Sequence, residues 1–280
     1  MSELLKGAPV ASAIAEDLGA RIEKLHARGV SPKLAVIRLG ERGGDLFYER
    51  SVLRYSARIG AEVESVVLPE TASQEELLAV IGRVNDDSAI HGCLLLRPVP
   101  KHMDSAAVCE ALRPDKDLDG MGTRALGALF AGQAGAFAPC TARSCMELLH
   151  YYEVPLSGAR AVVLGRSLVI GRPVSQLLLA DNATVTVCHS RSRDLPALCR
   201  EADVLIAAIG RPGFVGADFL REGQVVLDVG ASMVDGVMCG DVDFKAAEGL
   251  VKAITPVPGG VGAVTTATLF KHLVEAAERS

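Results

Sequence analysis

The stretch that decides the fold is Arg160-Ala-Val-Val-Leu-Gly165-Arg-Ser-Leu-Val-Ile-Gly171, an apolar run that breaks into a turn flanked by glycines. This order predicts a strand that leads into a helix whose N-terminus faces a phosphate group, as in dinucleotide-binding folds. Glycine lets the backbone come close to the pyrophosphate. The spacing departs from the regular G-x-G-x-x-G pattern, so an ordinary strand, turn and helix with glycines for packing stays open as an alternative.

The next predicted strand, 184–188, carries the signal for the kind of nucleotide. NAD-binding folds place an acidic residue at this strand tip, where it holds the ribose 2′-hydroxyl. Here the strand is followed by Ser190, Arg191 and Arg193, and no acid stands at its tip. Hydroxyl and guanidinium groups suit a 2′-phosphate, which a carboxylate would repel. Together with Arg166 on the glycine turn, these residues predict NADP as the cofactor.

Composition narrows the class of protein. The chain has 280 residues, 49% of them hydrophobic, which is enough for one large or two ordinary domains. A net charge of −5 and the lack of a long basic stripe argue against a nucleic-acid partner. No apolar run reaches the ~20 residues of a membrane span, and the N-terminus lacks the pattern of a secretory signal. We therefore expect a cytoplasmic protein with no membrane partner.

The cysteines do not predict a metal site. Seven are scattered along the chain, and only Cys140 and Cys145 lie close together. A C-x4-C pair without a second Cys or His pair is poor zinc spacing, so we expect mostly buried thiols and no metal. Aromatic residues make up 4% of the chain and tryptophan is absent. An aliphatic core of this kind is typical of a parallel sheet covered by helices.

Alternating patterns predict an α/β protein with parallel sheets in two domains. In the first part, the helical ranges are 11–28, 46–59 and 71–85, and the strands are 32–40, 61–68 and 92–100. After a helix at 142–152, strands recur at 160–164, 184–188, 203–209 and 224–229. Between Pro114 and Thr141 the pattern dissolves into charged, glycine and small residues, which indicates a domain junction.

We accordingly expect an N-terminal domain over 1–120, a connecting segment over 121–140, and a Rossmann-type nucleotide-binding domain over 141–264. The last predicted helix, 265–280, follows a glycine-rich loop. We expect it to complete the first domain.

Several segments become specific in combination. They are Pro114-Asp-Lys-Asp-Leu-Asp-Gly120, Ala138-Pro-Cys-Thr141 and Ile254-Thr-Pro-Val-Pro-Gly-Gly-Val-Gly262, together with Tyr48 and Gly165-Arg-Ser167. With these motifs the chain resembles the methylenetetrahydrofolate dehydrogenase/cyclohydrolase (FolD) family over essentially its whole length and in the same order. The resemblance implies a folate cleft between two α/β domains, NADP on the second domain and a homodimer.

The resemblance also implies residue roles. Asp119 would bind the pterin ring, whose edge offers paired N–H donors to a carboxylate, and Tyr48 would stack on or line the folate. The substrate-binding set would be Tyr48, Asp119, Leu96, Pro98, Gly259 and Gly260. The cofactor-binding set would be Gly165, Arg166, Ser167, Gly171, Thr141, Ser190, Arg191, Arg193 and Val261. Some of these residues have a plainer alternative: an acidic surface turn for Asp119, core packing for Tyr48, tight turns for the glycines, and a helix N-cap for Thr141.

The sequence departs from the family pattern in one polar cluster. The family helix reads Tyr-x-x-x-Lys, and its lysine is associated with the cyclohydrolase step; here that position is Val52. Leu96 replaces the glutamine that would position the lysine, and Asp45 stands where a serine is usual. Asp45 is the replacement base we consider, which leaves Tyr48, Asp45 and Asp119 as the candidate catalytic residues.

The two reactions of the family place different requirements on the active site. Hydride transfer from 5,10-methylenetetrahydrofolate to NADP can proceed if two bound rings are well positioned. Hydrolysis of the resulting methenyl cation usually needs a titratable group, and valine and leucine supply none. We therefore expect an NADP-dependent dehydrogenase of one-carbon metabolism with weak or absent cyclohydrolase activity. A fully bifunctional enzyme with a relocated base, a catalytically silent folate- or NADP-binding paralogue, and an enzyme with an altered substrate stay open.

Overall fold

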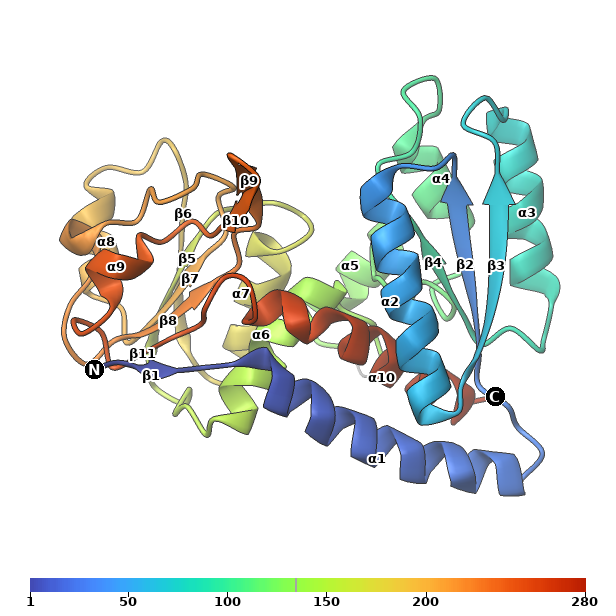
Figure 1. Cartoon of the computed structure of the whole chain (residues 1–280), viewed down its shortest axis with the longest axis horizontal. Coiled ribbons are helices and arrows are strands. Elements are labelled where there is room, and N and C mark those ends of the chain that lie inside the picture. Colours follow the sequence, from blue (N-terminus) through green and yellow to red (C-terminus); the bar gives the residue numbers. More distant parts are fainter. Residues whose placement is uncertain (134) are drawn as a thin grey trace. The chain divides into compact units, whose positions relative to one another are not determined.

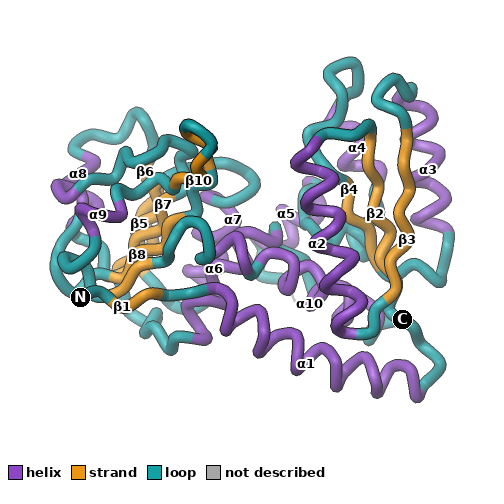
Figure 2. The backbone as a smooth tube through the Cα atoms, in the orientation of Figure 1, coloured by secondary structure: helices purple, strands orange, loops and turns teal. Residues whose placement is uncertain are grey.

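The computed structural model describes residues 1–133 and 135–280 and divides into two compact units (Figure 1). The three-stranded unit comprises Ala13–Cys140 and Thr266–Ser280, and the six-stranded unit comprises Met1–Ser12 and Thr141–Thr265. Both units are built from parallel strands and helices, which Figure 2 shows in orange and purple. The expected α/β fold class is confirmed.

The sheet of the three-stranded unit has the order β3-β2-β4, with β2 at Lys33–Leu39, β3 at Glu62–Leu68 and β4 at Gly92–Leu95. Its side chains alternate between two apolar clusters, so that Leu34 and Val36 pack on one face and Ala35 and Ile37 on the other. The helices of this part are α1 (Gly7–Ala27), α2 (Gly43–Ile59), α3 (Gln74–Asp86), α4 (Ser105–Ala111), α5 (Thr123–Phe130) and α10 (Thr265–Ala277).

Helices cover both faces of this sheet. Residues of α1, α2 and α10 form the cluster on the Val36 face, and residues of α3 and α4 form the cluster on the Ile37 face. Helix α3 begins with a capping box, in which the Ser73 hydroxyl accepts the N–H of Glu76 and the Glu76 carboxylate accepts the N–H of Ser73. Burial on both faces explains why β2 is almost continuously apolar.

The six-stranded sheet has the order β1-β11-β8-β7-β5-β6. Its strands are β1 (Glu3–Leu4), β5 (Arg160–Leu164), β6 (Thr184–Cys188), β7 (Val204–Ala207), β8 (Val225–Asp228) and β11 (Ala253–Ile254). Its helices are α6 (Cys140–Tyr151), α7 (Gly171–Ala180), α8 (Leu195–Arg200) and α9 (Phe244–Ala247), and a separate hairpin pairs β9 (Ser232–Val234) with β10 (Val237–Cys239). The expected strands at 160–164 and 184–188 are confirmed to the residue.

The division of the chain differs from the expected one at two places. Residues 1–12 belong to the six-stranded unit, because β1 pairs with β11 through Glu3 opposite Ala253 and Leu4 opposite Ile254. The segment expected as a connection, 121–140, belongs to the three-stranded unit and contains α5. The strand expected over 92–100 ends at Leu95, before the prolines that cannot donate to a sheet. No helix in the described ranges combines the length and the hydropathy needed to cross a membrane.

Candidate active site

The turn between β5 and α7 requires glycine at two positions. Gly165 has φ +133°, and a Cβ atom there would lie 2.1 Å from the carbonyl oxygen of Ala208. A Cβ atom on Gly171 would lie 2.3 Å from the carbonyl oxygen of Gly165. The Ser167 hydroxyl accepts the N–H of Ile170 at 3.1 Å, so the backbone is fixed just before α7 begins. The two glycines therefore let the turn pack closely against the backbone at Ala208 and against itself, and Arg166 and Ser167 between them are exposed. A tight glycine turn just before a helix N-terminus is the arrangement that pyrophosphate-binding folds use.

A pocket of about 280 Å³ lies at this turn, at the ends of β5, β6 and β7. Four of the predicted cofactor residues line it, namely Gly165, Arg166, Ser167 and Ser190. Sequence reasoning missed the other lining residues, which are Leu164, His189, Leu195, Ala208, Ile209, Arg211 and Phe214. Among the residues described, Gly171, Thr141, Arg191, Arg193 and Val261 do not line this pocket. Thr141 lies inside the first turn of α6, which begins one residue earlier.

The turn after β6 is tied to itself by hydrogen bonds. The Ser192 hydroxyl accepts the N–H of His189 at 3.0 Å, and the Nδ1 atom of His189 accepts the N–H of Arg191 at 3.1 Å. These bonds leave Ser190, Arg191 and Arg193 exposed next to the pocket edge formed by His189 and Ser190. Only Ser190 of the three lines the pocket, so the two arginines are neighbours of the site rather than part of its wall.

The loop after β7 is held by the carboxylate of Asp241, which belongs to none of the sequence motifs. Asp241 accepts the backbone N–H groups of Ile209, Gly210 and Arg211 at 2.6 to 3.0 Å. The Arg211 guanidinium lies 4.2 Å from the ring centroid of Phe214, so the pocket has a flat cationic and aromatic wall. The signal in the sequence was weak, because a single aspartate after a distant strand reads as an ordinary loop residue.

Asp228 at the end of β8 is a second buried carboxyl group of this edge, beside Asp241. Its carboxylate accepts the N–H groups of Gly230, Asp241 and Val242, each at 2.9 Å. Burial raises the pKa of Asp228 to about 6, and the three backbone hydrogen bonds oppose that rise. Asp228 therefore stabilises the loops that follow the strands.

The glycine loop at 259–260 is also conformationally demanding. Gly259 has φ +103°, and its carbonyl accepts the N–H of Gly7 at 2.8 Å. A Cβ atom on Gly260 would lie 2.5 Å from the carbonyl oxygen of Pro256. Val261 follows with its side chain buried. Backbone rather than side chain is thus presented at Gly259, which is exposed.

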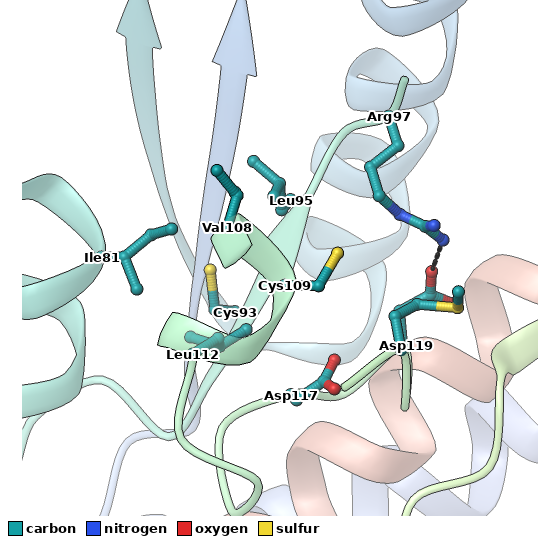
Figure 3. Close-up of a pocket in the computed structure, with 10 residues that line it drawn as sticks. Ile81, Cys93, Leu95, Arg97, Val108, Cys109, Leu112, Asp117 and Asp119 are labelled. Atoms are coloured by element: carbon teal, nitrogen blue, oxygen red, sulfur yellow. Dashed lines mark hydrogen bonds and ion pairs between the residues drawn. The ribbon is translucent and has the colours of Figure 1, made fainter. Parts of the chain in front are cut away.

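In the three-stranded unit, Asp119 lies in a polar cluster at the end of β4 (Figure 3). Its Oδ2 atom is 3.1 Å from Nη2 of Arg97, and its Oδ1 atom accepts the N–H of Cys140 at 3.3 Å. Both residues line a pocket with apolar and sulfur-bearing side chains. The space in this pocket is about 20 Å³, enough for one or two water molecules. Pro98, the next residue after Arg97, is exposed.

A second carboxyl group, Asp117, lies below Asp119 in the same pocket (Figure 3). It is buried and accepts the N–H of Gly122 at 2.8 Å. Burial raises the pKa of Asp117 to about 6; the negative charge of Asp119 adds to the rise, and the Gly122 hydrogen bond and Arg97 oppose it. A shifted carboxyl group in a pocket is one signature of a functional site, although its hydrogen bond also gives it a role in the turn.

The positions of the expected polar cluster are apolar. Val52 has no exposed surface and Leu96 is 5% exposed, and both belong to the cluster that α1, α2 and α10 build on the sheet. Tyr48 packs against the same cluster and is partly exposed. The structure therefore places Val52 and Leu96 in one apolar cluster, with Tyr48 packed against it.

A buried ion pair lies beside this cluster. The Nε atom of Arg38 is 2.7 Å from Oε2 of Glu49, and the two side chains are each 9% exposed. Strand alternation places Arg38 on the sheet face of Val36 and Leu96. Sequence reasoning missed this pair, because an arginine inside an apolar strand and a glutamate inside a helix are far apart in the sequence.

Asp45, the candidate replacement base, is also paired. Its Oδ2 atom lies 2.7 Å from Nη2 of Arg42, at the start of α2. The side chain is 13% exposed, so water reaches it only in part. An acid in the first helical turn is also where the helix dipole favours negative charge, which is a structural reason for Asp45 to stand there.

Comparison with known proteins also divides the chain into two consecutive parts. The family model for the tetrahydrofolate dehydrogenase/cyclohydrolase catalytic domain matches residues 5–119, and the model for the NAD(P)-binding domain of that family matches residues 139–280. The bifunctional protein FolD of Carboxydothermus hydrogenoformans is 46% identical over 281 residues, which cover 99% of this chain and 98% of the relative.

Solved structures agree with these matches. The bifunctional enzyme FolD of Campylobacter jejuni, a methylenetetrahydrofolate dehydrogenase/cyclohydrolase, superposes with a TM-score of 0.97 at 36% identity, covering 100% of this chain and 99% of the other. FolD of Trypanosoma brucei, solved with NADP cofactor and an inhibitor, superposes with a TM-score of 0.93 at 36% identity, covering 99% and 98%.

Proposed function

This chain belongs to the tetrahydrofolate dehydrogenase/cyclohydrolase family, and on that premise we propose that it oxidises 5,10-methylenetetrahydrofolate to 5,10-methenyltetrahydrofolate with NADP, with weak or absent cyclohydrolase activity. The observation that carries the second half of the proposal is the complete burial of Val52 in an apolar cluster with Leu96. The family resemblance assigns the lysine and glutamine of the hydrolytic step to these two positions.

The residues around the glycine turn suit NADP. Gly165 and Gly171 shape the tight turn before α7, and Ser190 lines the pocket where an NAD-binding protein would carry an acid. Arg166 on the same wall supplies a positive charge for phosphate oxygens. When bound, NADP accepts the hydride that the oxidation releases. The exposed guanidinium groups of Arg191 and Arg193 would attract the 2′-phosphate from outside the wall.

Only a few protein groups would contact the folate. Asp119 accepts hydrogen bonds from the pterin edge, and Tyr48 lines the ring system. The family resemblance also assigns Gly259 and Gly260 to the substrate, and Gly259 presents exposed backbone. The family resemblance assigns Leu96 and Pro98 to the substrate as well; Leu96 is buried and Pro98 is exposed. The nitrogen lone pairs of the substrate drive loss of the hydride, so these residues need only orient the substrate.

Hydrolysis asks for a proton carrier, and the nearby candidates are paired. Glu49 is bound to Arg38, and Asp45 is bound to Arg42. A guanidinium stays protonated and makes a poor base. Position 52 carries valine in place of the lysine that the family resemblance associates with the cyclohydrolase step, which is why we propose that the methenyl product leaves unhydrolysed.

Two absorbance assays on the purified chain test this function. Formation of NADPH from methylenetetrahydrofolate should be saturable, and enzyme-dependent decay of methenyltetrahydrofolate should stay close to the uncatalysed rate. Saturable folate binding without turnover would instead identify a silent paralogue. Rapid decay that is lost in Asp45→Ala would identify Asp45 as the relocated base, and rapid decay in both proteins would contradict the proposed loss.

Restoring the polar pair sharpens the same test. The double variant Val52→Lys with Leu96→Gln should raise the hydrolysis rate by at least tenfold, since a positioned acid or base contributes about 10²- to 10⁴-fold. The single variant Val52→Lys should instead mainly lose stability, because it buries an ammonium group among apolar side chains. No gain in the double variant would show that positions 52 and 96 do not control the hydrolytic step.

A homodimer is part of the proposal, as the family resemblance implies. The hairpin β9–β10 exposes four apolar side chains, namely Met233, Val234, Val237 and Met238, which is surface of the kind that protein contacts cover. Light scattering at two protein concentrations should give twice the chain mass, and a monomer at both would contradict it.

A further inference from the structure

Arg97 adds a positive charge directly next to the carboxylate proposed to bind the pterin. Figure 3 shows the guanidinium reaching down from the segment after β4 to Asp119, which comes from a different loop. The two side chains are each 24% exposed, so they are held together at 3.1 Å and still reach solvent. Arg97 is not among the residues proposed to bind the folate or the NADP.

The surrounding loop prevents Asp119 from turning away from Arg97. The N–H of Cys140 binds the other carboxylate oxygen at 3.3 Å. The preceding carbonyl, that of Leu118, is bound by Nδ1 of His272 at 2.9 Å. The following residue, Gly120, has φ +60°, and a Cβ atom there would lie 2.3 Å from the carbonyl oxygen of Phe137. Asp119 is therefore fixed as the partner of Arg97.

The charge of this pair matters because the reaction changes the charge of the folate ring. Methylenetetrahydrofolate is neutral at its ring system, and loss of a hydride, a proton with two electrons, leaves the methenyl product with one positive charge. A lone carboxylate would bind that cation more tightly than it binds the neutral substrate. A carboxylate paired with a guanidinium has no net charge and loses most of this preference.

We propose that Arg97 is a specificity-determining residue, which offsets the charge of Asp119 and thereby weakens retention of the cationic methenyl product relative to neutral folates. The inference rests on the proposed function, since it needs a folate beside Asp119. It also fits an enzyme in which the apolar side chains of Val52 and Leu96 supply no group for hydrolysis of the product while it is bound. A bifunctional enzyme has to retain the cation until water attacks it, whereas an enzyme with dehydrogenase activity only has to release it.

Equilibrium binding to the full chain tests the proposal without turnover. Dissociation constants for tetrahydrofolate and for methenyltetrahydrofolate are measured at one fixed pH for the wild type, Arg97→Leu, Arg97→Gln and Arg97→Lys. The readout is the preference for the cation, the Kd of tetrahydrofolate divided by that of methenyltetrahydrofolate. The matched control is Arg113→Leu, which removes a guanidinium from an exposed pair with Asp115.

We expect Arg97→Leu and Arg97→Gln to raise the preference for the cation by about tenfold. The interaction of two unit charges about 12 Å apart, at an effective dielectric constant of about 20, has an effect of this size on affinity. The increase should shrink at high ionic strength, because salt screens partly exposed charges. Arg97→Lys and Arg113→Leu should stay within about twofold of the wild type. Should Arg97→Leu fail to fold, Arg97→Gln carries the same comparison.

Two results would overturn the proposal. If the neutral variants weaken both ligands by the same factor or leave the preference unchanged, Arg97 only supports the structure, and the dehydrogenase function stands untouched. If the wild type binds neither folate, the proposed function and this inference fail together.

Discussion

The carboxyl ends of the two parallel sheets differ in what they present to a ligand. In the six-stranded unit, β5 is followed by Gly165 and β6 by the turn that exposes Ser190, and both line a pocket that also has Arg166, Arg211 and Phe214 in its wall. In the three-stranded unit, Val52 and Leu96 lie in an apolar cluster, and charged side chains near that region form ion pairs, such as Arg97 with Asp119 and Arg38 with Glu49.

The difference shows which requirement each ligand imposes. A pyrophosphate needs backbone N–H groups and an absence of Cβ atoms, and both are fixed by local geometry that a substitution would destroy. A hydrolytic step needs one or two particular side chains, and these can be exchanged for apolar residues of the same cluster without loss of the fold. Nucleotide binding is therefore harder to lose than hydrolysis.

The largest effect is expected at the glycine turn. Gly165→Val should lower NADP affinity by at least 100-fold or prevent folding, because its Cβ would meet the Ala208 carbonyl and φ +133° is strained for any branched residue. The control is Gly82→Ala on α3, where nothing lies within 4 Å of an added Cβ, and it should change unfolding by less than about 1 kcal/mol. Thermal unfolding and NADP titration measure both. Normal NADP binding by Gly165→Val would remove the geometric argument.

A smaller but still large effect is expected for the buried pair in the three-stranded unit. Glu49→Gln should destabilise the fold by about 3 to 5 kcal/mol, because it leaves the Arg38 guanidinium buried without its partner. The double variant Arg38→Met with Glu49→Leu should recover most of that loss. Urea unfolding of the three proteins gives the coupling energy. A double variant as unstable as the single one would show that the pair, and not apolar packing, holds this edge together.

The pH dependence compares one carboxyl group in each unit. Burial raises the pKa of Asp117 and of Asp228 from 3.8 to about 6, so between about pH 4 and pH 6 each is protonated when folded and ionised when unfolded. Each therefore lowers stability as pH rises through this window, by at most about 3 kcal/mol.

Replacing either group by asparagine removes its share of this slope. We expect Asp117→Asn and Asp228→Asn each to gain stability relative to the wild type on going from pH 4 to pH 7, whatever their stability at pH 4. Denaturant unfolding at several pH values provides the comparison. Parallel curves for wild type and Asp117→Asn would mean that burial does not shift this carboxyl group.

Much of the fold could be read from local pattern. The strands at 160–164 and 184–188 were placed to the residue, because apolar runs ending in glycine or polar turns leave little choice of register. Helix α5 was missed because it is only 8 residues long and lies in a stretch interrupted by glycines, such as Gly122 before it and Gly132 after it. Strand β1 was missed because two residues have no pattern of their own, and only pairing with β11 makes them a strand.

The candidate site divides in the same way. Gly165, Arg166, Ser167 and Ser190 were found because they lie within one strand, turn and helix unit and its neighbour. Arg211 and Phe214 line the same pocket and were missed, because they follow β7 and carry no motif. Thr141 and Val261 were expected at the cofactor and do not line this pocket, and their roles rest on the family resemblance alone.

The sequence alone determined the parallel α/β class, the glycine turn, and the basic and hydroxyl residues after β6. It also determined the absence of a lysine at position 52. Each of these features can be recognised within a short stretch of residues. Only the tertiary structure decided that Val52 and Leu96 share a closed apolar cluster and that Arg97 binds Asp119. These contacts join segments that are 22 or more residues apart. Burial and charge pairing at such separations arise from packing and have no signature in local sequence.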